Sequence, residues 1–377
     1  MGRAGERGVV GRSVLIVGGG IAGLTHAVAA RRAGHEVEVV EVRPDWAVAG
    51  WGLSLTGPAV RALRAVELAD ECTAAGCPIF RTLHCDAAGT VRATMDLPSV
   101  LGPGQPAEVG MGRPALHRIL RERAEALGTV LRTGLAVDEL DPRTGTVRLS
   151  DGTTRTPDYV AGADGVRSRT REQLGLPGKP WYTGQMVWRA LVDRPEWASA
   201  IHTYAGPTFT TGLIPISAAK AYVFLTQSLA QPTELPAAEL ADGMRALLAP
   251  FTGPFAAVRD TIKDPAQVVR RPVHALLVDG PWHAGRGVLL GDAAHSPSPQ
   301  LVSGAALAIE DAVVLAEEVT RHEDLAVAFA AYDERRHERA RRLVETSVAI
   351  GRCEVAGRHD EVHALRRAGH AGMAAPI

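Results

Sequence analysis

Glycines at fixed spacing near the start of the chain could bind the phosphates of a dinucleotide. The segment 18–23 reads Gly-Gly-Gly-Ile-Ala-Gly, a GxGxxG pattern, and Glu41 stands further on. In such a pattern Gly18 permits a tight turn, Gly20 lets the backbone approach a pyrophosphate, and Gly23 allows a helix to pack closely on a strand. The helix N-terminus offers N–H groups to phosphate oxygens, and the Glu41 carboxylate can accept hydrogen bonds from ribose hydroxyls. The pattern predicts a dinucleotide site with a free ribose, and both NAD and FAD fit it.

Two later carboxylates also stand just past apolar runs. Asp164 follows the run 157–163 in an Asp-Gly pair, and Asp292 follows the run 287–290 in a Gly-Asp pair. A loop containing prolines and a helix expected from about residue 303 to 319 come after the second pair. Both carboxylates are therefore expected where strands end.

The glycine motif needs a strand, a turn and a helix, and the sequence predicts all three. Residues 13–17 are apolar without polar alternation, which is typical of a buried parallel strand. Residues 21–32 form an alanine-rich helical segment that ends at Ala33 and Gly34, a C-cap signal. Residues 35–40 predict a second strand with Glu41 at its end. Together these elements predict a βαβ unit.

The order of the three motifs resembles the single-component FAD-dependent aromatic hydroxylases, which are flavoprotein monooxygenases of the p-hydroxybenzoate hydroxylase type, over about residues 13–345. The resemblance implies that the glycine motif holds the ADP half of FAD and that the Asp-Gly segment lies near the pyrophosphate and also helps NAD(P)H to bind. It also implies that the Gly-Asp carboxylate bonds the ribityl chain. The cofactor-binding residues it implies are Gly18, Gly20, Ile21, Ala22, Gly23, Glu41, Arg113, Val137, Asp164, Asp292, Gly304 and Ala305. Pro299 is implied to line the pocket near the reactive carbon of the flavin.

The chain departs from the resemblance in the loop after Asp292. Many members carry glycine and asparagine where this chain has Val302 and Ala306. The change at 306 removes a side-chain amide near the flavin but leaves the backbone contacts. Glu310 and Asp311, in the helix that follows, are interpreted as its polar face.

Residues 181–272 alternate short β-like runs with turns and predict an antiparallel sheet. The runs cover residues 185–192, 201–204, 208–214 and 221–227. A period of two in the last run puts Tyr222, Phe224 and Thr226 on one face. By resemblance this sheet binds the substrate, and its polar candidates are Trp188, Arg189, His202, Tyr204, Tyr222 and Gln227. The candidate catalytic residues are His202 and Tyr204, which share a strand face, and Tyr222. The sequence gives no direction to the pocket, so a core or surface role stays open for each.

The predicted fold is α/β, with a Rossmann-type FAD-binding domain, an inserted antiparallel β-sheet substrate domain and a C-terminal helical tail. The FAD-binding domain is expected to be discontinuous, at residues 13–80, 105–180 and 273–324, and the substrate domain to comprise 81–104 and 181–272. Residues 325–377 form the tail. In the tail, 325–350 predict a helix, the basic run 335–342 a solvated face, and 364–377 a frayed end.

Composition excludes several classes of protein. The chain has 377 residues, of which 46% are hydrophobic and 22% charged, as is typical of a soluble globular protein. Its 41 basic and 42 acidic residues leave a net charge of −1, so no overall field attracts nucleic acid or anionic lipid. The four cysteines fit neither a zinc spacing nor a disulfide framework, so we expect no metal site and a cytoplasmic location. No signal peptide or membrane span is expected.

The predicted function is that of an FAD-dependent monooxygenase, an oxidoreductase. The resemblance implies that NADH or NADPH reduces the flavin transiently, that O2 forms a flavin C4a-hydroperoxide, and that an aromatic or heteroaromatic small molecule is hydroxylated. The alternatives are another flavoenzyme on this scaffold (an epoxidase, a Baeyer–Villiger-like oxygenase, a halogenase or a prenyl-chain reductase) and a non-catalytic flavin-binding protein. The Trp-x-Trp-x-Ile-Pro signature is absent from residues 181–200, which weakens the halogenase alternative. We expect a monomer or homodimer, with no nucleic acid or membrane partner.

Overall fold

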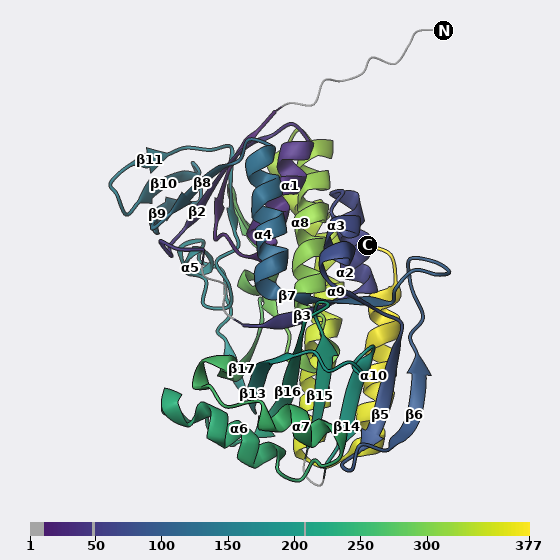
Figure 1. Ribbon diagram of the computed structural model, residues 1–377. Coiled ribbons are helices and arrows are strands. Elements are labelled where there is room, and N and C mark those ends of the chain that lie inside the picture. The colour runs from purple at the N-terminus through teal and green to yellow at the C-terminus, as the bar shows by residue number, and fades with distance from the viewer. Residues whose placement is uncertain (1–10, 47–49, 207–208) are drawn as a thin grey trace.

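The structure is a computed structural model that describes residues 11–46, 50–206 and 209–377. Two lobes lie one above the other in Figure 1, and we refer to them as the upper and lower lobes. The upper lobe is built on a six-stranded sheet in the order β18-β19-β12-β1-β2-β8, whose central strands are parallel. Its strands are β1 (Ser13–Val17), β2 (Glu36–Glu41), β8 (Val130–Thr133), β12 (Tyr159–Gly162), β18 (His283–Ala284) and β19 (Gly287–Leu289).

Helices cover the six-stranded sheet, and two small sheets complete the upper lobe. The helices are α1 (Ile21–Arg32), α2 (Gly57–Ala65), α3 (Ala69–Ala75), α4 (Arg113–Ala126), α5 (Arg169–Gln173) and α8 (Gly304–Arg321). The sheet β3-β7-β4 lies where the upper lobe meets the lower one (Figure 1), and the sheet β11-β10-β9 lies at the outer edge. Their strands are β3 (Gly52–Thr56), β4 (Cys77–Ile79), β7 (Glu108–Gly112), β9 (Val137–Asp141), β10 (Thr146–Leu149) and β11 (Thr154–Arg155).

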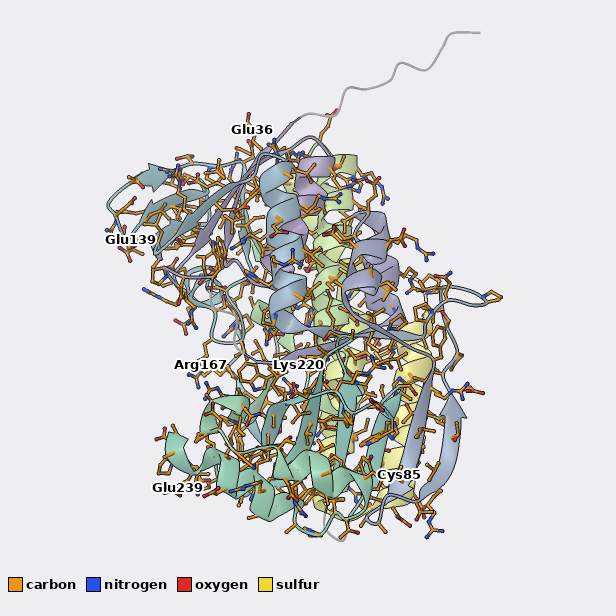
Figure 2. The ribbon with its side chains drawn as sticks, viewed as in Figure 1. Glu36, Cys85, Glu139, Arg167, Lys220 and Glu239 are labelled. Carbon is orange, nitrogen blue, oxygen red and sulfur yellow. The ribbon has the colours of Figure 1, made fainter. Side chains whose placement is uncertain are left out.

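The lower lobe is built on an eight-stranded sheet in the order β20-β17-β13-β16-β15-β14-β5-β6. In Figure 2 the labels Glu239, just before α6, and Cys85, on β5, mark its two sides. The strands are β5 (Arg81–Asp86), β6 (Val91–Asp96), β13 (Trp181–Asp193), β14 (Ile201–Ala205), β15 (Thr210–Pro215), β16 (Lys220–Ser228), β17 (Val268–Leu277) and β20 (His295–Ser296). Its helices are α6 (Leu240–Leu248) and α7 (Pro254–Asp260), with the short 3-10 turns η1 (Ala237–Glu239) and η2 (Pro265–Gln267). The helices α9 (Leu325–Val355) and α10 (His359–Ala374) and the 3-10 turns η3 (Gly291–Ala293) and η4 (Pro299–Leu301) contribute buried residues to the core of the upper lobe.

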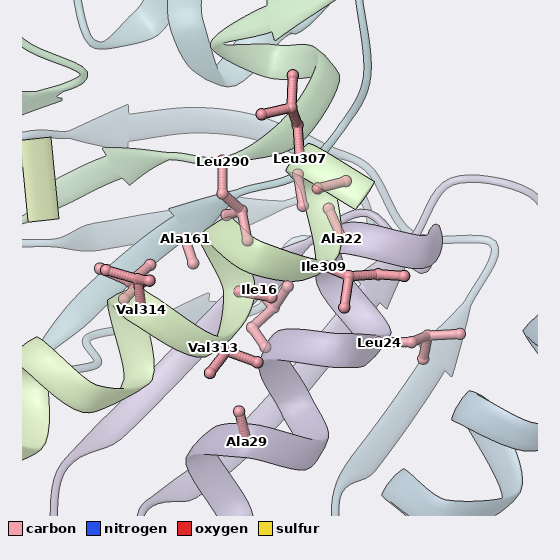
Figure 3. Close-up of a cluster of buried hydrophobic side chains, with 14 of the residues drawn as sticks. Ile16, Ala22, Leu24, Ala29, Ala161, Leu290, Leu307, Ile309, Val313 and Val314 are labelled. Carbon is pink, nitrogen blue, oxygen red and sulfur yellow. The ribbon is translucent and has the colours of Figure 1, made fainter. Parts of the chain in front are cut away.

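The core of the upper lobe is the contact between α1, α8 and the parallel strands. Figure 3 shows Ile16 of β1 and Leu24 of α1 beside Ile309 and Val313 of α8, and all four are buried. Four of the five residues at 13–17 are buried, which explains why the run lacks polar alternation. The predicted strand, turn and helix therefore occur where the sequence indicates them.

The predicted fold class is confirmed, and the faces of the lower sheet follow the predicted period of two. Val223 and Leu225 pack in a core with Phe255 of α7, whereas Tyr222 belongs to a separate cluster on the other face. β17 runs to Leu277, beyond the boundary expected at residue 272. Residue 208, at the start of one predicted run, lies outside the described residues. The division into domains stays a prediction.

Two expectations for the C-terminal tail are wrong. The basic run is not a solvated face throughout, because Arg336 is 0% exposed and pairs with acidic residues of α8. The end is not frayed, because α10 continues to Ala374 and buries Val362 and Met373. Its apolar residues are too widely spaced in the sequence to reveal this face, and packing against α9 stabilises it.

His26 of α1 predicts how stability depends on pH. Its ring nitrogens bond the Ala312 carbonyl oxygen (3.0 Å) and the Tyr159 hydroxyl (2.9 Å), and burial lowers its pKa to about 4. An unfolded histidine titrates near 6.5, so this stability is complete above that pH and is lost as the pH falls toward 4. We expect a loss of about 2 kcal/mol at pH 5 relative to pH 8. Urea unfolding at both pH values should show a smaller difference in His26→Gln, and an equal difference would contradict this role.

Candidate active site

The three glycines of the GxGxxG motif lie between β1 and α1 and have different surroundings. Gly18 has φ +107°, and a Cβ there would lie 2.5 Å from the Ala163 carbonyl oxygen. A Cβ at Gly23 would lie 2.0 Å from the carbonyl oxygen of Gly18. Gly20 is exposed, with no atom within 4 Å of an added Cβ. Gly18 and Gly23 are therefore required by the fold, whereas Gly20 leaves open space at the start of α1.

The N-terminus of α1 has the geometry that a phosphate group needs. No side chain caps this helix, so the N–H groups of its first turn, which includes Ile21, Ala22 and Gly23, are not bonded by a capping residue. The carbonyl oxygen of Gly20 accepts only the intrahelical bond from Leu24 (2.9 Å). Free N–H groups and the helix dipole both favour an anion at this position.

Glu41 closes the glycine loop from the end of β2. Its carboxylate accepts hydrogen bonds from the N–H groups of Gly19 (2.9 Å) and Arg43 (2.9 Å). His117 of α4, which was not among the predicted site residues, bonds the Gly19 carbonyl oxygen at 2.8 Å through Nε2. Burial lowers the pKa of His117. The loop is thus bonded on both sides, with the Glu41 carboxylate at the place where a ribose is expected.

Asp164 organises its own loop. Its carboxylate accepts bonds from the hydroxyl of Ser168 and from the N–H and hydroxyl of Thr170, both at 3.0 Å. Arg171, which is buried, donates to the carbonyl oxygens of Ala293 (2.9 Å) and Val166 (3.2 Å). This arginine, which was not among the predicted site residues, joins the Asp-Gly and Gly-Asp segments. The Asp164 side chain is already bonded, so what its loop can offer to a cofactor is backbone.

Arg113 and Asp292 act on each other electrostatically across the site. Burial lowers the pKa of Arg113 and the charge of Asp292 opposes that shift. The Asp292 side chain is exposed at its surface, but the surrounding protein removes enough water to raise its pKa. The charges of His295 and Arg113 offset part of this increase. The Arg113 Nε atom is buried and has no hydrogen-bond partner among the described residues. Val137, the other predicted cofactor contact in this part of the chain, is buried at the start of β9.

A buried network of charged residues, centred on Asp311 of α8, holds the Gly-Asp segment in place. Asp311 accepts bonds from the Gly291 N–H (2.9 Å), from His295 Nε2 (2.6 Å) and from Arg336 Nε (2.8 Å). Arg336 also pairs with Glu310 at 2.9 Å. Burial alone would raise the pKa of Asp311, but the charges of His295 and Arg336 outweigh it and lower the pKa to about 2. The interpretation of Glu310 and Asp311 as a polar helix face is therefore wrong, because both pair inside the protein.

The loop from Pro297 to Gly304, which we call the flavin loop, ends where α8 begins. Pro299 opens η4, and Val302 adopts a left-handed conformation with φ +54°. Gly304 is the first residue of α8, followed by Ala305, and no side chain caps this helix. The loop therefore leads into a helix with an uncapped N-terminus that packs against η3, the turn that contains Asp292.

The lower sheet separates the three candidate catalytic residues. Tyr204 packs against Phe255 of α7, with ring centroids 4.5 Å apart, and His202 stacks on Tyr204 at 6.3 Å. Tyr222 lies on the opposite face, where a Cβ at Gly52 of β3 would lie 2.4 Å from its ring. His202 and Tyr204 face the α6–α7 core, so the predicted catalytic role is wrong for these two residues, whereas for Tyr222 it stays a prediction.

Of the remaining sheet candidates, only Arg189 shares the face of Tyr222. Trp188 and Gln227 bond each other at 3.0 Å and lie with Leu225 on the face toward α6 and α7. The charge of Arg189 lowers the pKa of Tyr222 on one side and that of Arg113 on the other. Arg189, which lies opposite Phe224 on β13, is therefore close enough to Tyr222 and to Arg113 for its charge to act on both. Arg167, on the loop after Asp164, lies between the lobes (Figure 2).

These features fit FAD. The site offers open space at Gly20, an uncapped α1, an unbonded Arg113 Nε atom and an uncapped α8. Helix N-termini suit a pyrophosphate and the electron-rich edge of a reduced flavin ring, and an arginine suits phosphate oxygens.

Comparisons with known proteins agree with this fit. A sequence profile described as an FAD binding domain matches residues 12–347. Aurachin C monooxygenase/isomerase of Stigmatella aurantiaca is 33% identical over 350 residues, covering 90% of this chain and 89% of that protein. The 2-heptyl-3-hydroxy-4(1H)-quinolone synthase of Pseudomonas aeruginosa is 32% identical over 311 residues, or 81% and 80% of the two chains. The crystal structure of Klebsiella pneumoniae HpxO with FAD and uric acid is 24% identical, covers 97% of both chains and has a TM-score of 0.84, which supports the fold.

The predicted cofactor and family are therefore confirmed. In the described part of the chain, no helix is long and apolar enough to cross a membrane. Members of this family use NAD(P)H and O2 to hydroxylate aromatic or heteroaromatic small molecules. The profile covers most of the chain, and so do two relatives more than 30% identical. The chain belongs to the FAD-dependent aromatic hydroxylase family and is an FAD-dependent monooxygenase.

Proposed function

We propose that this enzyme hydroxylates a planar nitrogen heteroaromatic that carries an oxygen substituent, bound between the flavin and the Tyr222 face of the lower sheet. The observation that carries the proposal is Arg189. Within the described residues, its half-buried guanidinium has no ion-pair or hydrogen-bond partner, and it lies beside Tyr222. An unpaired cation in a partly buried site is a strong recognition group for an anionic or enolic oxygen.

The names of two relatives support a nitrogen heterocycle. One makes a hydroxylated quinolone, and the structure of another contains uric acid. Both compounds are planar rings that contain nitrogen and carry oxygen substituents. Phe224 is half-buried on the same face, with its ring centroid 6.1 Å from that of the buried Tyr222, and it offers flat apolar surface to such a ring.

Each residue has a part in the proposed reaction. FAD, once reduced by NADH or NADPH, supplies the activation of O2. Arg189 orients the substrate oxygen and stabilises negative charge on it, which makes the ring more electron-rich. Burial raises the pKa of Tyr222 to about 12, so its hydroxyl stays protonated at neutral pH and acts as a hydrogen-bond donor, not as a base. The twelve predicted cofactor residues are proposed to hold FAD as described above, with Asp292 at the ribityl chain and Pro299 near the reactive carbon.

The proposal is tested with purified holoenzyme and a substrate panel. The panel contains 4-quinolones, uric acid, a hydroxynicotinate and a hydroxybenzoate, assayed with NADH and with NADPH. We expect one nitrogen heterocycle to accelerate NAD(P)H oxidation and to gain one oxygen atom by mass spectrometry. Hydroxylation of the hydroxybenzoate alone would contradict the substrate class. An epoxide, a ring-expanded ester or no oxygen gain would favour the alternative flavoenzymes.

Arg189→Leu is expected to raise KM for the heteroaromatic substrate about 10- to 100-fold, because a charge-assisted hydrogen bond contributes about 1.5–3 kcal/mol. FAD occupancy should remain complete, since Arg189 lies on the substrate sheet. The matched control is Arg270→Leu, which removes an arginine that stacks on Trp188 of the opposite face at 5.1 Å. Steady-state kinetics of both variants check the prediction. An unchanged KM in Arg189→Leu would remove the observation on which the proposal rests.

We further propose a cytoplasmic enzyme that is a monomer or a homodimer. All four cysteines are free and buried, which suits a reducing compartment. Light scattering of the purified protein measures the oligomeric state directly.

A further inference from the structure

We propose that the C-terminal helices α9 and α10 position the flavin loop, and that Gln300 is the positioning residue that keeps Val302 in its left-handed conformation. The proposal rests on FAD binding by the family and is independent of the substrate proposed above.

Gln300, in the middle of the flavin loop, is bonded to both the lower sheet and α9. Its Nε2 atom donates to Gln185 Oε1 of β13 at 2.6 Å and to Glu354 Oε2 of α9 at 3.3 Å. Gln185, which is 1% exposed, donates to the same Glu354 oxygen at 3.3 Å. Arg366 of α10 holds the other Glu354 oxygen at 2.8 Å. One loop side chain is thereby connected to three elements that are distant in sequence.

Two glycines let the helices approach this closely. A Cβ at Gly351 of α9 would lie 2.9 Å from Gln185 Oε1 and 3.2 Å from Gln300 Nε2. A Cβ at Gly369 of α10 would lie 2.7 Å from the side chain of Leu301, which is fully buried. The loop is therefore held by polar bonds at Gln300 and by packing at Leu301, the two residues before Val302.

The backbone conformation of Val302 is unfavourable and has to be stabilised by neighbouring residues. Its φ of +54° is a left-handed conformation, which is unfavourable for a β-branched residue. The side chain is 38% exposed, so its own burial contributes little to holding it there. The restraint must come from neighbouring residues, and Gln300 and Leu301 are the bonded and packed neighbours on its N-terminal side.

The conformation of Val302 affects how the start of α8 is presented to the flavin ring. Val302 is followed by Ser303 and by Gly304, where α8 begins and where the backbone N–H groups are expected to meet the flavin ring. If Val302 left its left-handed conformation, the start of α8 would be presented differently to the ring. The tail helices, which contribute no predicted FAD contact, would thus set the environment of the flavin.

The test combines two substitutions in a cycle and uses FAD as the probe. Gln300→Leu removes the bonds, and Val302→Gly removes the strain, because glycine adopts the left-handed region freely. We expect Gln300→Leu to raise the Kd for FAD about fivefold in the Val302 background and less than about twofold in the Val302→Gly background. The visible absorbance spectrum of bound flavin should shift in Gln300→Leu alone and return to the wild-type spectrum in the double variant.

Controls separate positioning from general destabilisation. Gln267→Leu removes a glutamine that bonds the backbone elsewhere in the lower lobe, and it should leave the Kd for FAD and the spectrum unchanged. Glu354→Ala removes the shared acceptor at a partly exposed position and should reproduce the spectral shift, which covers the case that Gln300→Leu folds poorly. Equal effects of Gln300→Leu in both backgrounds, or an unshifted spectrum in both Gln300→Leu and Glu354→Ala, would overturn the proposal.

Discussion

Asp311→Ala is expected to lower the free energy of unfolding of the apoprotein by about 3–5 kcal/mol. Asp311 and Arg336 are both 0% exposed, and the carboxylate is also hydrogen-bonded to His295. Removing it leaves a buried guanidinium with one remaining acid, Glu310, which Arg339 already shares at 2.8 Å. The Gly291 N–H loses its acceptor as well, so the turn that carries Asp292 loses its support.

Urea unfolding of apoprotein measures this loss without a contribution from bound FAD. Glu317→Ala is the matched control, because Glu317 lies on the same helix and pairs with Arg335 at the surface, where such a pair contributes about 0–1 kcal/mol. FAD titration of any folded fraction should also show weaker binding in Asp311→Ala. A stability equal to that of the Glu317→Ala variant would mean that the buried network is not structural.

Gly20→Ala is expected to weaken FAD binding about a hundredfold, or about 2.7 kcal/mol, with little change in apoprotein stability. In the chain alone a methyl group at this position meets no atom within 4 Å, and the φ of −79° suits alanine. The open space is where the pyrophosphate has to approach the backbone. The added methyl group therefore hinders FAD binding sterically but does not destabilise the folded apoprotein.

Two other glycines make this prediction specific. Gly18→Ala should destabilise the apoprotein itself, because its Cβ would meet the Ala163 carbonyl oxygen at 2.5 Å and its φ is positive. Gly372→Ala, in α10, adds a methyl group in open space far from the motif in sequence. This variant should leave FAD affinity unchanged and should not lower the stability of the apoprotein. Isothermal titration with FAD and thermal unfolding of the three apoproteins distinguish these outcomes. Undiminished FAD affinity in Gly20→Ala would place the pyrophosphate elsewhere.

The sequence predicts those parts of the site that depend on local patterns. The Gly18–Glu41 unit follows from a buried strand, a glycine turn and an alanine-rich helix that are contiguous in the chain, and the alternation that groups Tyr222 with Phe224 is equally local. Which sheet face lies against the upper lobe is decided by β3, whose Gly52 accommodates the Tyr222 ring, and no periodicity within β16 contains that information. His202 and Tyr204 were misjudged for this reason.

The buried polar networks could not be predicted, because their partners come from separate elements. Arg336 occurs in a run of arginines that all resemble surface residues, and only the packing of α9 on α8 selects it for burial. Arg171 and Gln300 each connect loops through contacts with residues distant in sequence. A charged or amide side chain shows no sequence signal that distinguishes a buried partner from water.

The parallel pairing of β14 with β5, in which Thr203 lies opposite His84, has a consequence for biosynthesis. The β5–β6 hairpin leaves the ribosome well before its partner, and residues 87–200 must be translated in between, which takes on the order of 10 s. During this interval β5 has an unpaired edge, and the exposed Val91 and Met95 of β6 lie beside it. Nascent chains stalled before residue 201 should therefore bind chaperones more strongly than chains stalled far enough beyond residue 228 that β14, β15 and β16 have left the ribosome.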